Sequence, residues 1–482
     1  MGQPTRRAGG RLALRLRDEG PLLALLAAFA ATRLVARLVF GLRFDASTFG
    51  YWQVLDVPLL RDDLLRSLLY LHSQPPLHNL VLGAVLKASP EALVPRVFEA
   101  LFLVLGFLLL AGIHALLLEL GTPPRAALAA ALLQTFSTTW LVYEAWLFYT
   151  LPTAVLVTWA AVWLARAARG RPRPAMAYAA AVAALSWTRA SYPPAFAAVA
   201  LALLVAAAPL PAVRRVALRS SLLAFAFAVA LAAKNLVLVG SFATSTWLGM
   251  SLARMTTEGL PAATREEWVS RGLLEETALV PAFSPLADYP PELRMVPPGL
   301  PAHPALAAER KADGSPNLNH GAYLRIGASC RRAAVTVVRL RPDVYLRQLG
   351  RAFRTWLRPP TDYDFVAPAR RALGGWDRLH SRLLLGSGEG RRKNGPTLVL
   401  VPAALLVLAA LLLRPREERR RILLVLAFPA LAIAANLAGN LVEVEENNRF
   451  RVEVEGLMVA VGSWGLVDAA RALFRGRRRI GS

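Results

Sequence analysis

The chain has 482 residues, of which 55% are hydrophobic and only 18% charged, and the apolar residues gather in long runs. This composition is typical of a polytopic membrane protein and excludes an ordinary soluble domain. The formal net charge of +24 does not indicate nucleic-acid binding, because the arginines stand in short clusters between apolar runs.

The apolar runs 97–118, 126–142, 194–210, 221–240 and 396–413 are long enough, at about 1.5 Å per residue, to cross roughly 30 Å of hydrocarbon, and a helix between each inside and outside loop gives about ten spans. The first apolar run, 21–31, follows a basic segment and resembles a signal sequence, but Arg33 and Arg37 follow it without a small-residue cleavage site. We therefore expect an uncleaved helix there. The ten expected spans are 21–42, 97–118, 126–143, 152–168, 175–190, 194–211, 219–240, 396–414, 421–440 and 455–471.

Basic residues set the expected topology, because Lys and Arg in short loops stay on the cytoplasmic side of a membrane. Arginine clusters mark 6–17, 166–173, 214–219, 414–421 and 475–479 as cytoplasmic. The loops 143–152 and 441–446 contain no Lys or Arg, so we expect them outside, and both termini inside.

The expected fold is an all-α bundle of about ten transmembrane helices in the inner (plasma) membrane, in three parts. Residues 1–240 form an N-terminal transmembrane module, 241–395 an extracytoplasmic loop region, and 396–482 the C-terminal transmembrane helices. The apolar stretch 76–89 is too short to cross a membrane comfortably. It is expected to lie at the outer interface or to be re-entrant.

Polar and ionisable residues crowd the first outer loop, directly after the first span. They include Asp45, His72, Gln74 and His78. A carboxylate at the membrane boundary is partly desolvated, which raises its basicity and suits it to accept a proton from an acceptor hydroxyl or amine. Asp45 is the first candidate for this role. The alternative is that Asp45 caps a helix that begins at Ala46.

The order Asp45, then Gln74-Pro75-Pro76-Leu77, then Arg96 resembles the GT-C superfamily of membrane glycosyltransferases. The similar branch contains the protein O-mannosyltransferases and aminoarabinose transferases, and the resemblance covers 22–194. Two positions depart from the family pattern: the usual acidic pair is Asp45-Ala46, and the leading His of the motif is Gln74, with His72 two positions earlier.

The second outer loop carries a carboxylate and aromatic rings, Glu144 and Tyr149 among them. The resemblance implies that this loop contributes to the active site, with Glu144 as a second catalytic carboxylate that holds an acceptor or a sugar hydroxyl. The alternative is an aromatic belt at the membrane interface with a solvated glutamate.

Cations on the outer side could hold a lipid phosphate while its bond to a sugar breaks. The candidates are Arg189 at the end of one apolar helix, Arg449 and Arg451 after another, and Lys234 in the outer half of a third. The alternative for each is that its side chain snorkels to lipid headgroups.

These features predict a glycosyltransferase that moves a sugar from a polyprenyl-phosphate donor to a lipid, glycan or protein acceptor. His72, Gln74 and Tyr149 would bind substrate, and no cofactor, metal or nucleic acid is expected. The single cysteine, Cys330, excludes an intrachain disulfide and a CxxC metal site. The alternatives are a transporter or lipid flippase, and a noncatalytic membrane scaffold.

Overall fold

The computed structural model describes residues 5–385, 411 and 416–480. Within these residues every regular element is an α-helix or a 3-10 helix, and backbone pairing outside helices is limited to two isolated bridges. Together with the long apolar helices, this confirms an all-α, multi-pass membrane protein.

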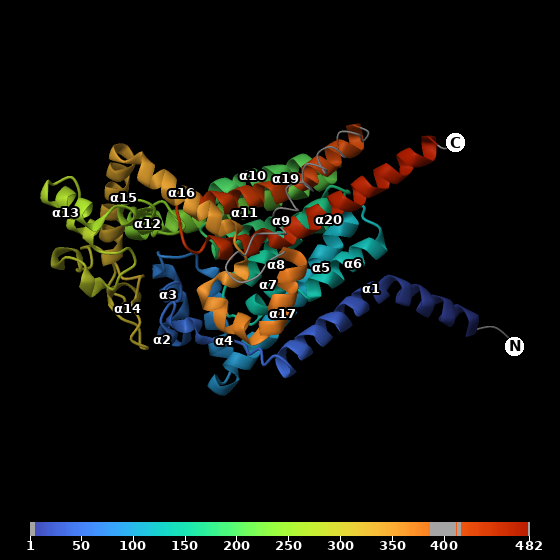
Figure 1. Cartoon of the computed structure of the whole chain (residues 1–482), viewed down its shortest axis with the longest axis horizontal. Helices are drawn as coiled ribbons and strands as arrows, with labels where there is room; N and C mark the ends of the chain where they lie inside the picture. Colours follow the sequence, from blue (N-terminus) through green and yellow to red (C-terminus); the bar gives the residue numbers. More distant parts are fainter. Residues whose placement is uncertain (1–4, 386–410, 412–415, 481–482) are drawn as a thin grey trace.

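The larger part of the molecule is a bundle in which α8 lies at the centre and packs against α5, α9 and α20 (Figure 1). Proline occupies the first turn of many bundle helices, where its missing N–H costs no hydrogen bond. The bundle helices are α1 (Thr5–Leu38), α5 (Val94–Glu119), α6 (Pro124–Thr135), α7 (Thr138–Glu144), α8 (Thr150–Ala167), α9 (Pro172–Thr188), α10 (Pro194–Ala207), α11 (Pro211–Val239), α19 (Arg416–Ala438) and α20 (Asn447–Ile480).

Among the described residues, five helices are long and apolar enough to cross a membrane, fewer than the ten spans expected. They are Gly20–Leu38, Glu91–Glu119, Thr150–Ala167, Pro211–Val239 and Glu418–Leu441. The expected span 126–143 is instead the pair α6 and α7, bent by 60°, which would make a sixth. The expected span 396–414 lies outside the described residues apart from residue 411.

Three of the expected spans, 175–190, 194–211 and 455–471, correspond to helices that do not qualify as spans by length and composition. The helix α10 is a short apolar helix of 14 residues, and α9 has 17 residues. The helix α20 is not among the helices that qualify as spans by length and composition in the described part of the chain. The count of about ten crossings therefore stays a prediction.

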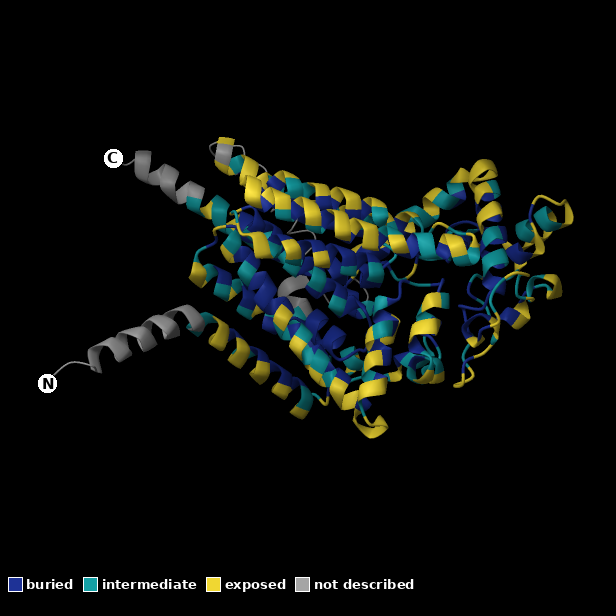
Figure 2. Ribbon diagram, turned by 180° about the vertical axis from the view of Figure 1, so that it is seen from behind, coloured by how far each residue is buried: buried dark blue, intermediate teal, exposed yellow. Residues whose placement is uncertain are grey.

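Exposed residues follow the outer faces of the peripheral bundle helices (Figure 2), and many of them are large and apolar. On α11, Leu222, Leu223 and Val237 are 62%, 74% and 82% exposed. In contrast, 72% of the α8 window is buried inside the protein. Large exposed apolar surfaces on peripheral helices suit contact with lipid.

The first loop after α1 forms three short helices, α2 (Val57–Asp62), α3 (Leu64–Tyr70) and α4 (Leu77–Ala88). The buried Asn79 ties this loop together, because its side chain accepts from Leu55 N and donates to Gln53 O at 2.8 and 2.9 Å. As expected for 76–89, α4 is apolar but shorter than a span.

The insertion begins where α11 ends at Gly240, whose positive φ of 70° is favourable for glycine. Two of its helices, Leu248–Met255 and Ala322–Leu340, are closely packed. A Cβ placed on Gly249 of the first would lie 1.8 Å from the carbonyl oxygen of Gly327 in the second. Its helices are α12 (Leu248–Met255), α13 (Ala262–Ser270), α14 (Pro304–Ala307), α15 (Ala322–Leu340), α16 (Pro342–Leu357) and α17 (Ala367–Leu385).

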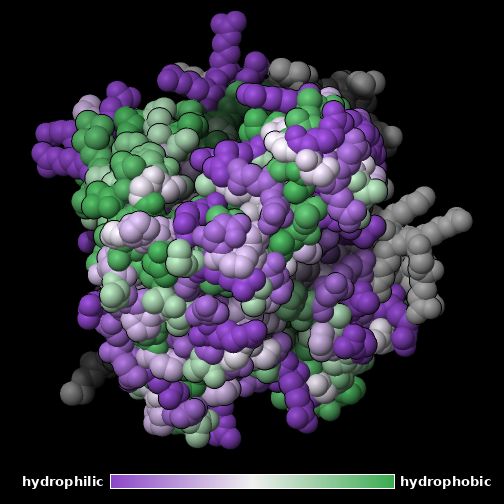
Figure 3. Space-filling view, turned by 90° about the vertical axis from the view of Figure 1, so that its left-hand side faces the viewer, coloured by the Kyte–Doolittle hydropathy of each residue, from purple (hydrophilic) through white to green (hydrophobic). Residues whose placement is uncertain are grey.

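The insertion helices α12 to α15 lie at the end of the bundle opposite both chain termini (Figure 1), while α17 packs back along the bundle against α7. Seen from that end, the surface is mostly hydrophilic, with hydrophobic patches near its edges (Figure 3). The first-loop helices and the insertion also contact each other, through α3 and α14. Both segments therefore surround the same end of the bundle.

Candidate functional site

Two neighbouring cavities open at the end of the bundle that carries the insertion. The first, which we call the arginine cavity, has a volume of about 600 Å³ and lies between α9, α10, α11, α12, α19 and the start of α20. The second, the α16 cavity, has a volume of about 1040 Å³. The side chains common to both walls are Trp52, Gln53, Arg254 and Glu446, so the two cavities adjoin.

The arginine cavity brings together four of the residues proposed from sequence, which are Arg189, Arg449, Tyr149 and Gln74. Arg189 Nη1 donates to the Tyr149 hydroxyl at 2.9 Å, and its guanidinium lies 5.1 Å from the centre of the Tyr149 ring. The Arg449 guanidinium lies 5.5 Å from the same ring and 5.0 Å from the Phe148 ring. These contacts hold two cations beside one tyrosine in a wall of the cavity.

Each of the cavity arginines has a glutamate nearby. Arg189 Nε lies 2.8 Å from Glu453, and Arg449 forms an ion pair with Glu446. Arg449 is only 1% exposed, and its Nε has no hydrogen-bond partner among the described residues. A buried N–H group of this kind on a cavity-lining arginine is available to an anionic ligand.

A third pair comes from the insertion, because α12 supplies Arg254, which lies 3.3 Å from Glu443. The Arg254 guanidinium also lies over the rings of Trp52 and Phe283, at 5.7 and 4.7 Å. Glu443 lines the arginine cavity from the loop between α19 and α20. The insertion and the last loop of the bundle thus meet at the cavity wall.

The two glutamates of this loop that line the arginine cavity have opposite electrostatic environments. Burial raises the pKa of Glu443 to about 7, although Arg254 opposes the rise. Burial also disfavours the charged form of Glu446, but the Arg449 guanidinium outweighs it and lowers the pKa of that carboxyl. Between them lies Glu445, whose backbone has a positive φ of 98°, a conformation that a non-glycine residue adopts only under strain.

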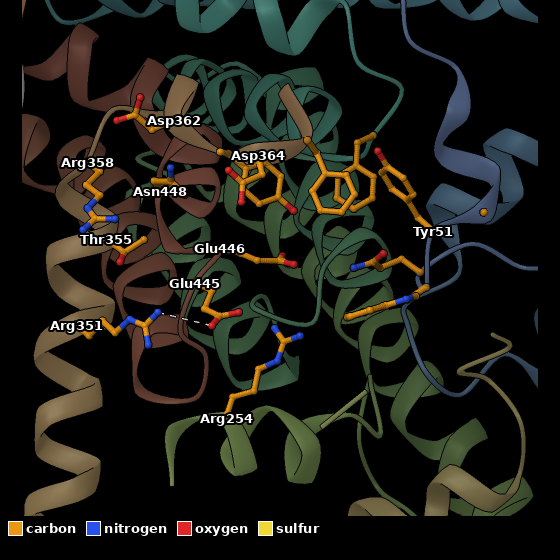
Figure 4. A pocket seen from close by; sticks show the side chains of 16 residues that line it. Tyr51, Arg254, Arg351, Thr355, Arg358, Asp362, Asp364, Glu445, Glu446 and Asn448 are labelled. Carbon is orange, nitrogen blue, oxygen red and sulfur yellow. Dashed lines mark ion pairs between the residues drawn. The ribbon is translucent and has the colours of Figure 1, made fainter. Parts of the chain in front are cut away.

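The α16 cavity is lined by charged and polar groups that point inward (Figure 4). Arg351 comes from α16 and Arg358 directly follows this helix, and Arg351 lies 3.7 Å from Glu445. Asp364 and Asn448 also line the cavity, with Asn448 near Arg358 (Figure 4). A cavity of this size with charges of both signs can accommodate a ligand with many hydrogen-bonding groups.

Aromatic rings form the other wall of the α16 cavity. Tyr51, Phe148, Tyr363 and Phe365 line it, and the Tyr51 and Phe365 ring centres lie 4.8 Å apart. Behind them Trp146 stacks on Phe148, with ring centres 4.5 Å apart. Flat aromatic faces beside polar groups are suited to the apolar faces and hydroxyls of a sugar.

Asp45 lies beside the α16 cavity but does not line it. Its backbone pairs with the second outer loop, since Asp45 N donates to Ala145 O at 2.7 Å and Leu147 N donates to Asp45 O at 3.0 Å. Its carboxylate accepts from Ser47 N at 2.8 Å. Burial raises the pKa of the Tyr51 phenol, and the nearby Asp45 charge adds to the rise.

Glu144 is held inside the bundle and lines neither of the two large cavities. Arg33 of α1 donates to both of its carboxylate oxygens, at 2.7 and 2.5 Å. The Glu144 side chain packs against Gly106 so closely that a Cβ there would lie 2.4 Å from its carboxyl carbon. The Arg33–Glu144 ion pair therefore links α1 to α7, and it lies next to Gly106 of α5.

Of the other first-loop candidates, Gln74 lines the arginine cavity, whereas His72 does not. The His72 ring bonds to Thr246 Oγ1 and Asn319 O, at 2.8 and 3.0 Å. Burial lowers the pKa of His72 to about 3, so the ring is neutral at pH 7. His72 therefore fastens the first loop to the insertion.

Two of the proposed phosphate-binding cations also lie elsewhere. Lys234 Nζ donates to Leu71 O at 2.5 Å, and Arg451 Nη1 donates to Trp356 O and Leu357 O, both at 3.1 Å. Arg451 thus satisfies carbonyl groups at the C-terminal end of α16. Neither side chain lines either cavity.

Sequence reasoning missed Arg254 and Glu443. Arg254 lies in the insertion, which offered no motif, and only folding brings it to the bundle. Glu443 belongs to the run Val442-Glu443-Val444-Glu445-Glu446, directly before the arginines that were singled out. The sequence did contain a signal for Glu443, because three glutamates precede Arg449 in a loop that was expected to lie outside the membrane.

No cluster of three His, Cys, Asp or Glu side chains suited to a metal ion occurs in the described part of the chain. Comparison with protein-family models, with curated proteins and with solved structures found no match to this chain. Function is therefore argued from the two cavities and the residues around them.

Proposed function

We propose that this protein is a membrane glycosyltransferase that moves a sugar from a polyprenyl-phosphate donor to an acceptor at the membrane surface. One observation carries the proposal. An arginine-lined cavity that reaches between bundle helices adjoins a polar, aromatic-lined cavity beneath the insertion. Such a pair can place a lipid-linked phosphate next to a hydroxylated acceptor.

The arginine cavity suits the donor. Its walls include apolar residues of α10, α11 and α19, such as Pro194, Ala232 and Ala435, beside Arg189 and Arg449. A polyprenyl chain would lie along the apolar walls, and its phosphate would take charge-assisted hydrogen bonds from the guanidinium groups. These cations would also stabilise the lipid phosphate as it leaves the sugar.

The α16 cavity suits the acceptor. Its aromatic wall of Tyr51, Phe148 and Phe365 offers stacking surfaces, and Arg351, Asp364 and Asn448 offer hydrogen bonds. The two cavities meet at Trp52, Gln53, Arg254 and Glu446, which is where the anomeric carbon would lie in this arrangement.

The resemblance of Asp45, Gln74-Pro75-Pro76-Leu77 and Arg96 to the GT-C pattern supports the same reaction class. The resemblance implies catalytic roles for Asp45 and Glu144 and a site on the extracytoplasmic face of the plasma membrane, but neither of these side chains lines the two cavities. The lipid, glycan or protein nature of the acceptor stays open within this proposal.

The test is a transfer assay on the full chain in lipid nanodiscs, with polyprenyl-phosphate sugars as donors and envelope lipids, glycans or peptides as acceptors. We expect formation of free polyprenyl phosphate together with glycosylated acceptor. A flippase would instead move labelled polyprenyl-phosphate sugar between the leaflets of a vesicle without releasing the sugar. That result would replace the enzyme proposal.

A further inference from the structure

Four carboxylates near the two cavities already have a hydrogen-bond or ion-pair partner in the protein. Asp45 accepts a backbone N–H and lies outside both cavities, and Glu144 is bound by Arg33 at both oxygens. Glu453 is paired with Arg189 and lies outside both linings, and Glu446 is closely paired with Arg449. A carboxylate fixed by a close cation is a poor proton acceptor, because the cation stabilises its ionised form.

Glu443 differs from these four in its position. It lines the arginine cavity, and its ion pair with Arg254 is longer, at 3.3 Å. Its Oε1 also accepts from Val444 N at 3.0 Å. Arg254 lines both cavities, so Glu443 stands beside the place where they meet.

We propose that Glu443 is the group that accepts the proton from the acceptor nucleophile. This inference rests on the proposed glycosyl transfer and names a residue that the family resemblance does not assign. Arg254 is then a positioning residue, which orients the Glu443 carboxylate from the insertion.

The reaction balances with this assignment. The acceptor O–H gives its proton to the Glu443 carboxylate while the acceptor oxygen forms a bond to the anomeric carbon. The bond from that carbon to the phosphate oxygen breaks, and polyprenyl phosphate leaves with the electron pair. Arg189 and Arg449 stabilise its charge.

The charges that face Glu443 favour a proton acceptor near neutral pH. Arg254 from α12 stabilises its ionised form, whereas Glu446 in its own loop and the burial of the site disfavour it. The α16 side of the loop contributes Arg351, which is paired with Glu445. Since the pKa of Glu443 is raised to about 7, the carboxylate can take up a proton at physiological pH.

The experiment measures turnover of Glu443→Gln, Glu443→Asp and Asp45→Asn in the nanodisc transfer assay from pH 5.5 to 9. Wild-type turnover should rise with pH up to about 7 and then level off, because the base must be ionised. Glu443→Gln should lower turnover by about 10² to 10⁴, and Glu443→Asp should retain part of it with a shifted pH profile.

Glu275→Gln is the matched control, because Glu275 is another glutamate paired with an arginine of the insertion, Arg332, at 2.8 Å, and it lines neither cavity. Its turnover and pH profile should equal those of the wild type. Thermal unfolding and binding of polyprenyl phosphate by Glu443→Gln show whether that variant is folded.

Three outcomes test the role of Glu443 and the proposed glycosyl transfer separately. Loss of turnover in folded, donor-binding Glu443→Gln with an active Asp45→Asn supports the inference. Full activity of Glu443→Gln overturns it and leaves the proposed glycosyl transfer intact. Absence of sugar transfer by the wild type with every donor overturns the proposed function itself.

Discussion

Arg189 and Arg449 come from helices that lie more than 250 residues apart in the sequence, yet both guanidinium groups lie over the ring of Tyr149, at 5.1 and 5.5 Å. Two buried cations this close repel each other unless anions neutralise them. Glu446 and Glu453 supply that neutralisation in the protein, and a phosphate in the cavity would add to it.

We expect Arg449→Lys to weaken binding of polyprenyl phosphate. Lysine keeps the positive charge, so Glu446 stays compensated, but it loses the guanidinium geometry and the Nε donor. A charge-assisted contact contributes about 1.5 to 3 kcal/mol, so affinity should fall by roughly 10-fold or more. Titration of spin- or fluorophore-labelled polyprenyl phosphate measures the change.

The control for this variant is Arg332→Lys, on the exposed surface of α15 and outside both cavities. Its donor affinity should match that of the wild type. Equal affinities for wild type and Arg449→Lys would assign Arg449 a purely structural role.

Asp45→Asn should leave turnover within a few-fold of the wild type. The asparagine side-chain oxygen can accept the same hydrogen bond from Ser47 N, and the backbone pairing with the second outer loop is unaffected. The transfer assay with purified variant measures it. A fall of 100-fold or more with unchanged folding would return the role of proton acceptor to Asp45.

Glu144→Gln should act on stability more than on chemistry. It leaves Arg33 buried without a counter-charge, and breaking one side of a buried ion pair typically costs about 3 to 5 kcal/mol. We expect a lower melting temperature in detergent, with near-normal turnover in the folded fraction. A normal melting temperature combined with lost turnover would make Glu144 catalytic.

Membrane topology can be tested with reporter fusions. Reporters near Gln74, Tyr149, Gly314 and Glu446 should be extracytoplasmic, and those near Gly170, Arg214 and Arg416 cytoplasmic. The helices α12 to α15 of the insertion lie at one end of the bundle (Figure 1), so reporters in the insertion should all lie on one side of the membrane. A cytoplasmic reporter at Gln74 contradicts the enzyme proposal.

The helical class and the membrane character could be predicted from the sequence, because long apolar runs are local features. The bend of 60° between α6 and α7 and the short length of α10 could not be predicted, and the count of about ten crossings stays a prediction. Neither feature changes the local hydropathy.

For the site, the sequence predicted that Arg189, Arg449, Tyr149 and Gln74 lie on one side of the bundle, and in the structure all four line one cavity. It could not separate them from Lys234, Arg451 and His72, which bond to carbonyl groups elsewhere. That distinction depends on tertiary partners, which no local pattern contains.

The way the cavities are assembled has a consequence for biosynthesis. Their walls combine Trp52 from the first loop, Arg254 from the insertion and Glu446 from the last loop. Ribosomes release these segments in order, so a nascent chain contains no complete cavity until Glu446 has been made. A chain truncated before Glu446 therefore lacks part of the wall of both cavities.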